Sequence, residues 1–178
     1  MFSRTELLIG DKINLLKKSN IIIFGIGGVG GYVAEMLVRS GIENITLVDF
    51  DVVDLTNLNR QIIALQSAIG KFKVDVMKDR ILDINNKCNV KVFNEKLTSE
   101  NIENFNLLDY DYIIDAIDMI QSKVALIDYA YRHNLKIISA MGAGNRYDIP
   151  EFKVVDIYKN IVSTKGQKMI LNLWLAKI

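Results

Sequence analysis

The sequence predicts an α/β fold of the Rossmann-like type, in which a mostly parallel sheet carries helices on both faces. Three observations predict it. Short blocks of β-branched residues alternate along the chain with segments of helical periodicity. A glycine-rich loop joins the first such block to the first helix. Of the 178 residues, 50% are hydrophobic and 24% are charged, which suits one globular domain with a sizeable core.

The first fifty residues have the pattern of one βαβ unit, whose crossover should be right-handed. Residues 21–24 form a short apolar block that predicts a buried strand, and residues 25–31 form the glycine loop. Helical spacing then marks an apolar stripe of Val29, Val33, Met36 and Leu37. Gly41 is placed to end that helix, and residues 45–48 predict the second strand.

The alternation continues toward the C-terminus. The pattern predicts, in chain order, a helix over 71–85, strands over 90–93 and 112–115, a helix marked by Val124, Ile127 and Tyr131, and strands over 136–139 and 152–156. Strands that alternate with helices in this way indicate a parallel sheet.

The composition also excludes several classes of protein. Lys plus Arg number 22 and Asp plus Glu number 21, so a net charge of +1 gives no global attraction to nucleic acid or to an anionic membrane. The single cysteine, Cys88, cannot form an internal disulfide or build a Cys-rich zinc site. No segment has the pattern of a signal peptide or of a membrane span. We therefore expect a cytoplasmic protein.

The glycine loop has the context of a nucleotide-binding turn, because it follows a strand and opens a helix. Gly25 permits the tight turn, and Gly27 and Gly28 let the backbone approach a phosphate at the helix N-terminus. Asp49 ends the second strand, where a carboxylate can accept hydrogen bonds from ribose hydroxyls. The alternative is that the glycines only permit close packing of helix against sheet. The loop alone does not distinguish a dinucleotide from ATP.

Basic and amide side chains gather in the connection that leaves the second strand. Asn57, Asn59 and Arg60 lie close together there, and Lys73 follows. Two cations suit a triphosphate, because they neutralise its charge and stabilise charge that develops during transfer, whereas a dehydrogenase has no use for them. The alternative for Arg60 or Lys73 alone is a solvated surface cation.

A further pair of carboxylates follows the fourth strand. Asp115 and Asp118 lie in the sequence Asp115-Ala116-Ile117-Asp118. A carboxylate that faces bound phosphates normally needs a metal between them, usually Mg²⁺. Asp118 is therefore the candidate metal ligand, and its alternative role is the N-cap of the following helix.

Together these motifs resemble the ThiF/MoeB/HesA adenylating superfamily. The resemblance rests on Gly25-x-Gly27-Gly28-x-Gly30, Asp49-x-Asp51, residues 57–61, Gly70-x-x-Lys73 and Asp115-x-x-Asp118. Residues 2–10, 141–146 and 156–159 narrow it to the TcdA (CsdL) branch of tRNA threonylcarbamoyladenosine dehydratases. Family members continue beyond this region, so we expect an ATP-binding adenylating domain over 1–159 and a divergent tail over 160–178, the product of truncation or a frameshift.

The resemblance implies a role for each matched residue. It assigns nucleotide binding to Gly25, Gly27, Gly28, Gly30, Asp49, Asp51, Asn57, Asn59, Arg60, Lys73 and Asp118. It assigns catalysis to Arg4, Arg60, Lys73 and Asp118, with Mg²⁺ at Asp118. Arg4 resembles an N-terminal arginine that the family's dimer mate inserts into the ATP site, which implies a homodimer.

The implied reaction has two steps. A substrate carboxylate attacks the α-phosphate of ATP, and pyrophosphate leaves an acyl-adenylate. In the dehydratase branch the carboxylate belongs to the threonyl group of a modified adenosine in tRNA. A neighbouring carbamoyl atom then closes a ring and AMP leaves, so the net change is loss of water.

Three alternatives remain open. The first is adenylation of a ubiquitin-like sulfur carrier, which would make a sulfur-transfer protein the partner. The absence of paired CxxC motifs and the position of Cys88 between a helix and a strand argue against it. The second is a NAD-dependent oxidoreductase, which would leave Arg60, Lys73 and Asp118 without a purpose. The third is a non-catalytic nucleotide-binding remnant, which would bind ATP without releasing AMP.

Overall fold

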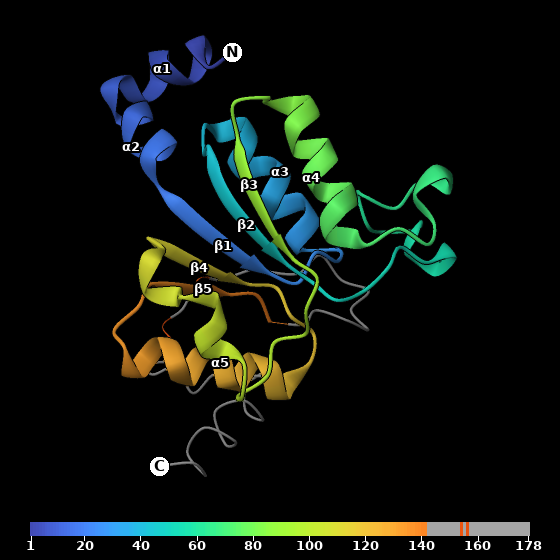
Figure 1. Ribbon diagram of the computed structural model, residues 1–178. Helices are drawn as coiled ribbons and strands as arrows, with labels where there is room; N and C mark the ends of the chain where they lie inside the picture. The colour runs from blue at the N-terminus through green and yellow to red at the C-terminus, as the bar shows by residue number, and fades with distance from the viewer. Residues whose placement is uncertain (142–153, 155, 157–178) are drawn as a thin grey trace.

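A parallel five-stranded sheet forms the centre of the molecule, with the strand order β3-β2-β1-β4-β5. The structure is a computed structural model that describes residues 1–141, 154 and 156. The strands are β1 (Asn20–Phe24), β2 (Asn44–Val48), β3 (Asn89–Phe93), β4 (Tyr112–Asp115) and β5 (Ile137–Ser139). The longer helices are α3 (Gly30–Ser40), α4 (Lys73–Ile84) and α5 (Ile120–Arg132). Figure 1 shows α3 and α4 on one face of the sheet and α5 on the other, which confirms the Rossmann-like α/β fold.

β1 lies in the middle of the sheet and is buried on both faces. Ile21 and Ile23 pack in the hydrophobic cluster that contains residues of α3 and α4, whereas Ile22 and Phe24 pack in the cluster that contains residues of α5. Successive side chains of a strand point to opposite faces, so a strand covered on both sides needs an unbroken apolar run. The unbroken apolar sequence of residues 21–24 is therefore what a strand buried on both faces requires.

The predicted strands over 21–24, 45–48, 90–93, 112–115 and 136–139 are confirmed to within one residue at each end. The helix predicted over 71–85 begins at Lys73 and ends at Ile84. Gly41 does end α3, in a left-handed conformation with φ of +113°.

The face that α3 buries differs from the prediction. The helix buries Gly30, Gly31, Ala34 and Val38. Two of the residues expected on the buried stripe, Val29 and Met36, are instead 50% and 66% exposed, although Val33 and Leu37 do pack against the core. The reason is steric, because small residues bring α3 close to the sheet and to the glycine loop. The buried stripe expected on α5 has a similar exception in Tyr131, which is 55% exposed.

Two short N-terminal helices were not predicted. α1 (Ser3–Ile9) and α2 (Ile13–Lys18) precede the amino end of β1, and α1 has no buried residue. Leu7 and Leu8 on α1 are 87% and 86% exposed, and Leu15 on α2 is 67% exposed. In Figure 1, α1 projects from the rest of the fold. These helices leave an apolar surface uncovered within one copy of the chain.

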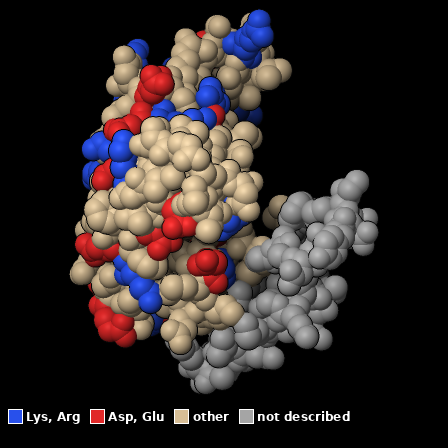
Figure 2. All heavy atoms as spheres, turned by 90° about the vertical axis from the view of Figure 1, so that its right-hand side faces the viewer, with Lys and Arg blue, Asp and Glu red and all other residues tan. Residues whose placement is uncertain are grey.

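Charged side chains are mixed by sign on the surface. Figure 2 shows acidic and basic residues interspersed over one face, as the net charge of +1 would suggest. No helix among the described residues is long and apolar enough to cross a bilayer. The strand predicted over 152–156, apart from Val154 and Asp156, and the tail predicted over 160–178 lie outside the described residues.

Candidate nucleotide-binding site

The predicted site residues gather at the edge of the sheet where β1, β2 and β4 end. Phe24 of β1 pairs with Val48 of β2 and Asp115 of β4, so the three strands end together. The glycine loop follows β1, Asp49 follows β2 and residues 116–119 follow β4. The strand order leads away from β1 in both directions, and open α/β sheets bind ligands outside their carboxyl ends at such a switch point.

The four glycines of the motif, Gly25, Gly27, Gly28 and Gly30, form two pairs. The structure excludes a larger side chain at one pair and not at the other. At Gly25 the backbone has φ of +87° and a Cβ would lie 2.7 Å from the carbonyl oxygen of Ala116; at Gly30 a Cβ would lie 1.8 Å from the carbonyl oxygen of Gly25. These two positions are glycine because of packing. At Gly27 and Gly28 the nearest atoms to an added Cβ are 3.8 and 3.7 Å away, so packing does not exclude a side chain there.

The exposed part of the loop presents backbone donors. The N–H groups of Gly27, Gly28 and Val29 donate to no acceptor within the described part of the chain. They precede α3, whose N-terminus carries the positive end of the helix dipole. Free N–H groups at the start of a helix form a ready site for an anion such as phosphate.

Asp49 connects the glycine loop to the end of β2. Its side chain is 8% exposed; one carboxylate oxygen accepts the Ile26 N–H at 2.6 Å and the other accepts the Asp51 N–H at 2.8 Å. Burial raises the pKa of the Asp49 carboxyl, and these two backbone hydrogen bonds oppose that rise. Each carboxylate oxygen has a second lone pair, so Asp49 can still accept a hydroxyl donor.

Lys73 is held at the same edge by an ion pair. Its Nζ lies 2.7 Å from Oδ2 of Asp51, and its backbone N–H donates to the Asp51 carbonyl at 3.0 Å. The lysine side chain is 7% exposed and that of Asp51 is 47% exposed. The ammonium group of Lys73 is therefore buried, whereas the carboxylate of Asp51 is accessible. Asp51 partly neutralises the charge of Lys73 before any phosphate binds.

Arg60 lies against the glycine loop. Its Cγ is 3.7 Å from the position of a Cβ on Gly28, and its Nη1 donates to Oδ1 of Asn59 at 3.0 Å and to the carbonyl of Thr56 at 3.1 Å. Asn57 is 8% exposed and accepts the N–H of a residue three positions before it, which closes the turn. The structure thus gives Asn57 and Asn59 local positioning contacts and places Arg60 beside the loop backbone.

Asp118 is exposed beside this loop and has no hydrogen bond or ion pair within the described part of the chain. α5 begins at Ile120, and its N-cap position is Met119, which makes no capping hydrogen bond. The alternative role of Asp118 as that N-cap is therefore not supported. The described residues contain no group of three or more His, Cys, Asp or Glu residues that could hold a metal ion.

Arg4 is not brought to this edge by its own chain. It lies on α1, which precedes the amino end of β1, whereas the glycine loop follows the carboxyl end. A strand of five residues spans roughly 16 Å. Within one copy of the chain, the predicted site is assembled without Arg4.

Two buried polar residues near the site were not predicted. Gln61 is 7% exposed and its amide nitrogen is 3.8 Å from a Cβ position on Gly27, while its Oε1 has no hydrogen-bond partner among the described residues. Lys123 of α5 is 3% exposed and pairs with Asp115. A sequence signal existed for Lys123, since it is three residues after Ile120 and next to Val124 on the buried side of the helix.

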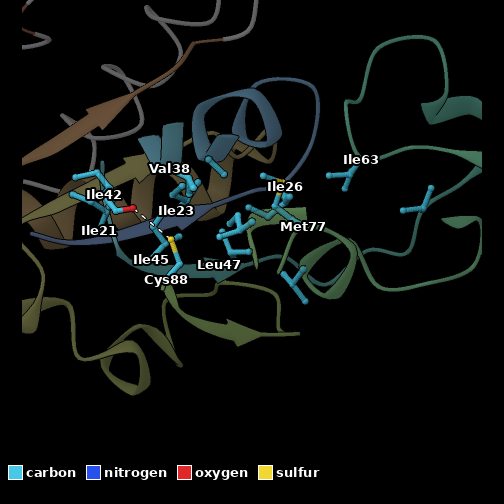
Figure 3. Close-up of a cluster of buried hydrophobic side chains, with 14 of the residues drawn as sticks. Ile21, Ile23, Ile26, Val38, Ile42, Ile45, Leu47, Ile63, Met77 and Cys88 are labelled. Carbon is cyan, nitrogen blue, oxygen red and sulfur yellow. Dashed lines mark hydrogen bonds between the residues drawn. The ribbon is translucent and has the colours of Figure 1, made fainter. Parts of the chain in front are cut away.

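Cys88 lies far from this edge. It precedes the amino end of β3 and belongs to the hydrophobic cluster of Figure 3, where its Sγ donates to the carbonyl of Ile42 at 3.6 Å. The residue is 8% exposed, and burial raises the pKa of its thiol, as does nearby Glu43. A thiol in this environment is a poor nucleophile.

The comparisons with known proteins agree with this geometry. The model of the ThiF family matches residues 4–156. A Bacillus subtilis tRNA threonylcarbamoyladenosine dehydratase is 46% identical over 175 residues, covering 94% of this chain and 69% of the relative. The Escherichia coli dehydratase is 40% identical over 169 residues, covering 94% of this chain and 63% of the relative.

Solved structures show the same likeness. The crystal structure of the E. coli dehydratase TcdA in complex with ATP has a TM-score of 0.94 at 38% identity, covering 99% of this chain and 73% of that chain. E. coli MccB with ATP has a TM-score of 0.68 at 27% identity, covering 72% of this chain and 39% of that chain. The chain spans 58% to 69% of the length of the bacterial curated relatives it matches.

Proposed function

The chain belongs to the ThiF family, and from that membership we propose that it is an ATP-dependent adenylating enzyme of the tRNA threonylcarbamoyladenosine dehydratase type. One observation carries the proposal. A continuous set of contacts runs from Lys73 through Asp51 and Asp49 to the backbone of the glycine loop, and the side chain of Arg60 lies beside the same loop at Gly28. Two cations at a phosphate-binding turn suit ATP better than a dinucleotide.

In the proposed first step, the phosphates of ATP accept hydrogen bonds from the free N–H groups of the glycine loop, and Asp49 accepts the ribose hydroxyls. The substrate carboxylate attacks the α-phosphorus, a new P–O bond forms, and the bond to pyrophosphate breaks. Arg60 and Lys73 stabilise the negative charge that moves onto the leaving group. The protein contributes by positioning and by charge stabilisation.

Mg²⁺ is part of this proposal. Asp118 is one exposed carboxylate without a partner in the described part of the chain, and Mg²⁺ is commonly held by one or two carboxylates together with substrate phosphates and water. The residues therefore fit a metal that arrives with ATP. When bound, Mg²⁺ would neutralise phosphate charge; the role of Asp118 is to hold it and to orient the phosphates.

In the proposed second step, an atom of the carbamoyl group attacks the activated threonyl carboxyl of the modified adenosine. A ring closes, and AMP leaves with one oxygen of the former carboxylate, so the nucleoside loses the elements of water. No protein nucleophile is needed. The burial of Cys88 supports this, because the thiol is inaccessible and lies away from the carboxyl ends of β1, β2 and β4.

A second copy of the chain would complete the site. Arg4 belongs to a helix that buries nothing within its own chain, and that helix exposes Leu7 and Leu8. We propose a homodimer in which these leucines pack on the partner and Arg4 reaches the partner's ATP. Mixing Arg4→Ala protein with Asp118→Asn protein tests this, since each mixed dimer would contain one intact site. Recovery of activity on mixing supports a site shared between two subunits. A mixture no more active than the two separate variants contradicts it.

The other proposals concern the binding partners of the protein and its cellular location. tRNA is the proposed substrate, and its contacts would come from a local surface because the chain has a net charge of +1. A cytoplasmic location and a sulfur-transfer protein as an additional partner are also proposals.

One experiment tests the function. The protein is mixed with ATP, Mg²⁺ and tRNA that carries threonylcarbamoyladenosine, and AMP and the mass of the nucleoside are measured. We expect AMP and a nucleoside lighter by one water. AMP formation that requires a ubiquitin-like sulfur carrier in place of tRNA would favour the sulfur-carrier alternative. ATP binding without AMP would favour the non-catalytic alternative, and calorimetric binding of NAD in preference to ATP would favour an oxidoreductase.

A further inference from the structure

A buried ionic cluster lies directly beneath the loop that carries Asp118. We propose that Lys123, Asp115 and Ser139 hold this loop against the glycine loop, and that Lys123 is a positioning residue for adenylation. The inference rests on the proposed function, because the loop matters for catalysis only if Asp118 acts there. Lys123 itself touches no proposed substrate atom.

Lys123 uses all three of its ammonium hydrogens within this cluster. Its Nζ lies 2.7 Å from Oδ2 of Asp115, 3.0 Å from the carbonyl oxygen of Ala140 and 3.2 Å from Oγ of Ser139. The side chains of Lys123 and Asp115 are 4% and 0% exposed. A lysine in α5 thus connects the carboxyl ends of β4 and β5.

Asp115 transmits this connection to the loop over 116–119. Its Oδ2 also accepts the hydroxyl of Ser139 at 2.5 Å, and its Oδ1 accepts the N–H of Ile117 at 3.1 Å. The far end of the loop is held as well, because the Lys123 N–H donates to the carbonyl of Met119 at 3.0 Å. Asp118 therefore lies between two fixed points, and its own carboxylate has no hydrogen bond to any residue that the structure describes.

The same loop is packed against the nucleotide-binding turn. The Ala116 N–H donates to the carbonyl of Phe24 at 2.8 Å, and the Ala116 carbonyl lies so close to Gly25 that no side chain fits between them. A shift of the 116–119 loop would therefore change the distance between Asp118 and the glycine loop. In catalysis, a misplacement of 1 Å can cost about 10²-fold in rate.

Stability alone is a weak explanation for this cluster. Replacing a buried ion pair by apolar residues of similar volume is often neutral or stabilising. The helix α5 already packs through Leu126, Tyr129 and Ala130, which have 4% exposure or less. Lys123 holds the Asp115 carboxylate, and that carboxylate in turn accepts the N–H of Ile117 in the Asp118 loop, which points to loop geometry as the purpose of the charges.

The test removes both charges together, so that no unpaired charge is left buried. In the double variant Lys123→Met with Asp115→Asn, we expect the rate constant of AMP formation to fall about 10²-fold. The dissociation constant for ATP should change less than about threefold, because the glycine loop and Arg60 keep their places. A purely structural role would instead lower the folded fraction and leave the rate per folded molecule unchanged.

A control removes an ion pair away from the site that is less buried than the Lys123–Asp115 pair and in which Glu35 also contacts Arg39. Arg80 of α4 contacts Glu35 of α3 at 2.5 Å, and the double variant Glu35→Gln with Arg80→Met should leave the rate of AMP formation unchanged. If the Lys123 double variant does not fold, Ser139→Ala tests the same cluster with one hydroxyl removed, and we expect a several-fold loss of rate.

A second measurement does not depend on activity. Amide hydrogen exchange at Ile117 and at Asp118 should become faster in the Lys123 double variant and stay unchanged in the control. If the wild-type protein forms no AMP, the proposed function fails, and this exchange measurement still decides whether the cluster fixes the loop. Wild-type exchange together with a wild-type rate in the Lys123 double variant would overturn the inference.

Discussion

Replacing Gly28 by alanine distinguishes the two explanations for the glycines of the loop, which are phosphate binding and close packing of helix against sheet. The atom nearest to an added Cβ would be Cγ of Arg60 at 3.7 Å, which is ordinary van der Waals contact, and the backbone there is not left-handed. Alanine also restricts the unfolded chain, which is worth about 0.4–1 kcal/mol in favour of folding. We therefore expect the free energy of unfolding to change by no more than about 1 kcal/mol.

The same methyl group should weaken ATP binding. It would stand over the backbone that we propose as the phosphate site, and a hydrogen bond to a charged group contributes about 1.5–3 kcal/mol. Loss of one such bond corresponds to a dissociation constant about 10- to 100-fold higher. Calorimetric titration with ATP measures this, and urea unfolding of the same preparation measures stability.

Gly30→Ala is the contrasting variant. Its Cβ would overlap the Gly25 carbonyl oxygen at 1.8 Å, so the backbone would have to move. Overpacking costs about 1–3 kcal/mol and sometimes more, and we expect a loss at or above the upper end of that range. Unaltered ATP binding by folded Gly28→Ala protein would refute the phosphate-binding role of Gly28, and packing would then explain only Gly25 and Gly30.

Three further predictions use other parts of the molecule. Asp118→Asn should abolish AMP formation yet change the free energy of unfolding by less than about 0.5 kcal/mol, because the carboxylate has no partner among the described residues; unfolding curves and an AMP assay check both. Cys88→Ala should retain the rate of AMP formation, and a large loss of rate in folded protein would contradict the structural role of that thiol. The hydrogen bond from Arg80 lowers the pKa of Glu35 below its ordinary value of 4.5, so the ionised carboxylate stabilises the fold above that pH and the contribution disappears as pH falls through the lowered pKa. The difference in unfolding free energy between wild type and Glu35→Gln should accordingly shrink on acidification, and a constant difference would contradict the assignment.

The strands were predictable because burial on both faces requires a short run of apolar residues, which can be recognised in the local sequence. Residues 21–24 are an uninterrupted apolar block and residues 45–48 are apolar except for Thr46, a pattern typical of strands covered on both faces in a parallel sheet. The buried face of α3 was not predictable from large apolar residues, since Gly30, Gly31 and Ala34 pack where bulk is excluded. Hydrophobic periodicity identifies helix faces that carry large apolar side chains. It does not identify a face that packs through glycine and alanine.

The predicted site shows a similar division. That Gly28, Asp49 and Arg60 lie at one edge was predictable, because each follows a strand or lies in the connection that leaves it, and the topology of a parallel sheet brings such segments together. Lys123 was missed because its partner, Asp115, lies on a different element and only the folded chain brings the two together. The N-terminal helices were not predicted because α1 buries no residue and α2 buries only Ile13, so neither has a clear apolar periodicity.

The contact between Gly25 and Ala116 links two segments that are about ninety positions apart in the chain. A nucleotide bound at this edge would therefore depend on β1, β2 and β4 at once, and partial unfolding of any of them would release it. Ligand binding should then protect the domain as one cooperative unit. At a free ATP concentration 100 times the dissociation constant, mass action would add about 2.7 kcal/mol to the free energy of global unfolding.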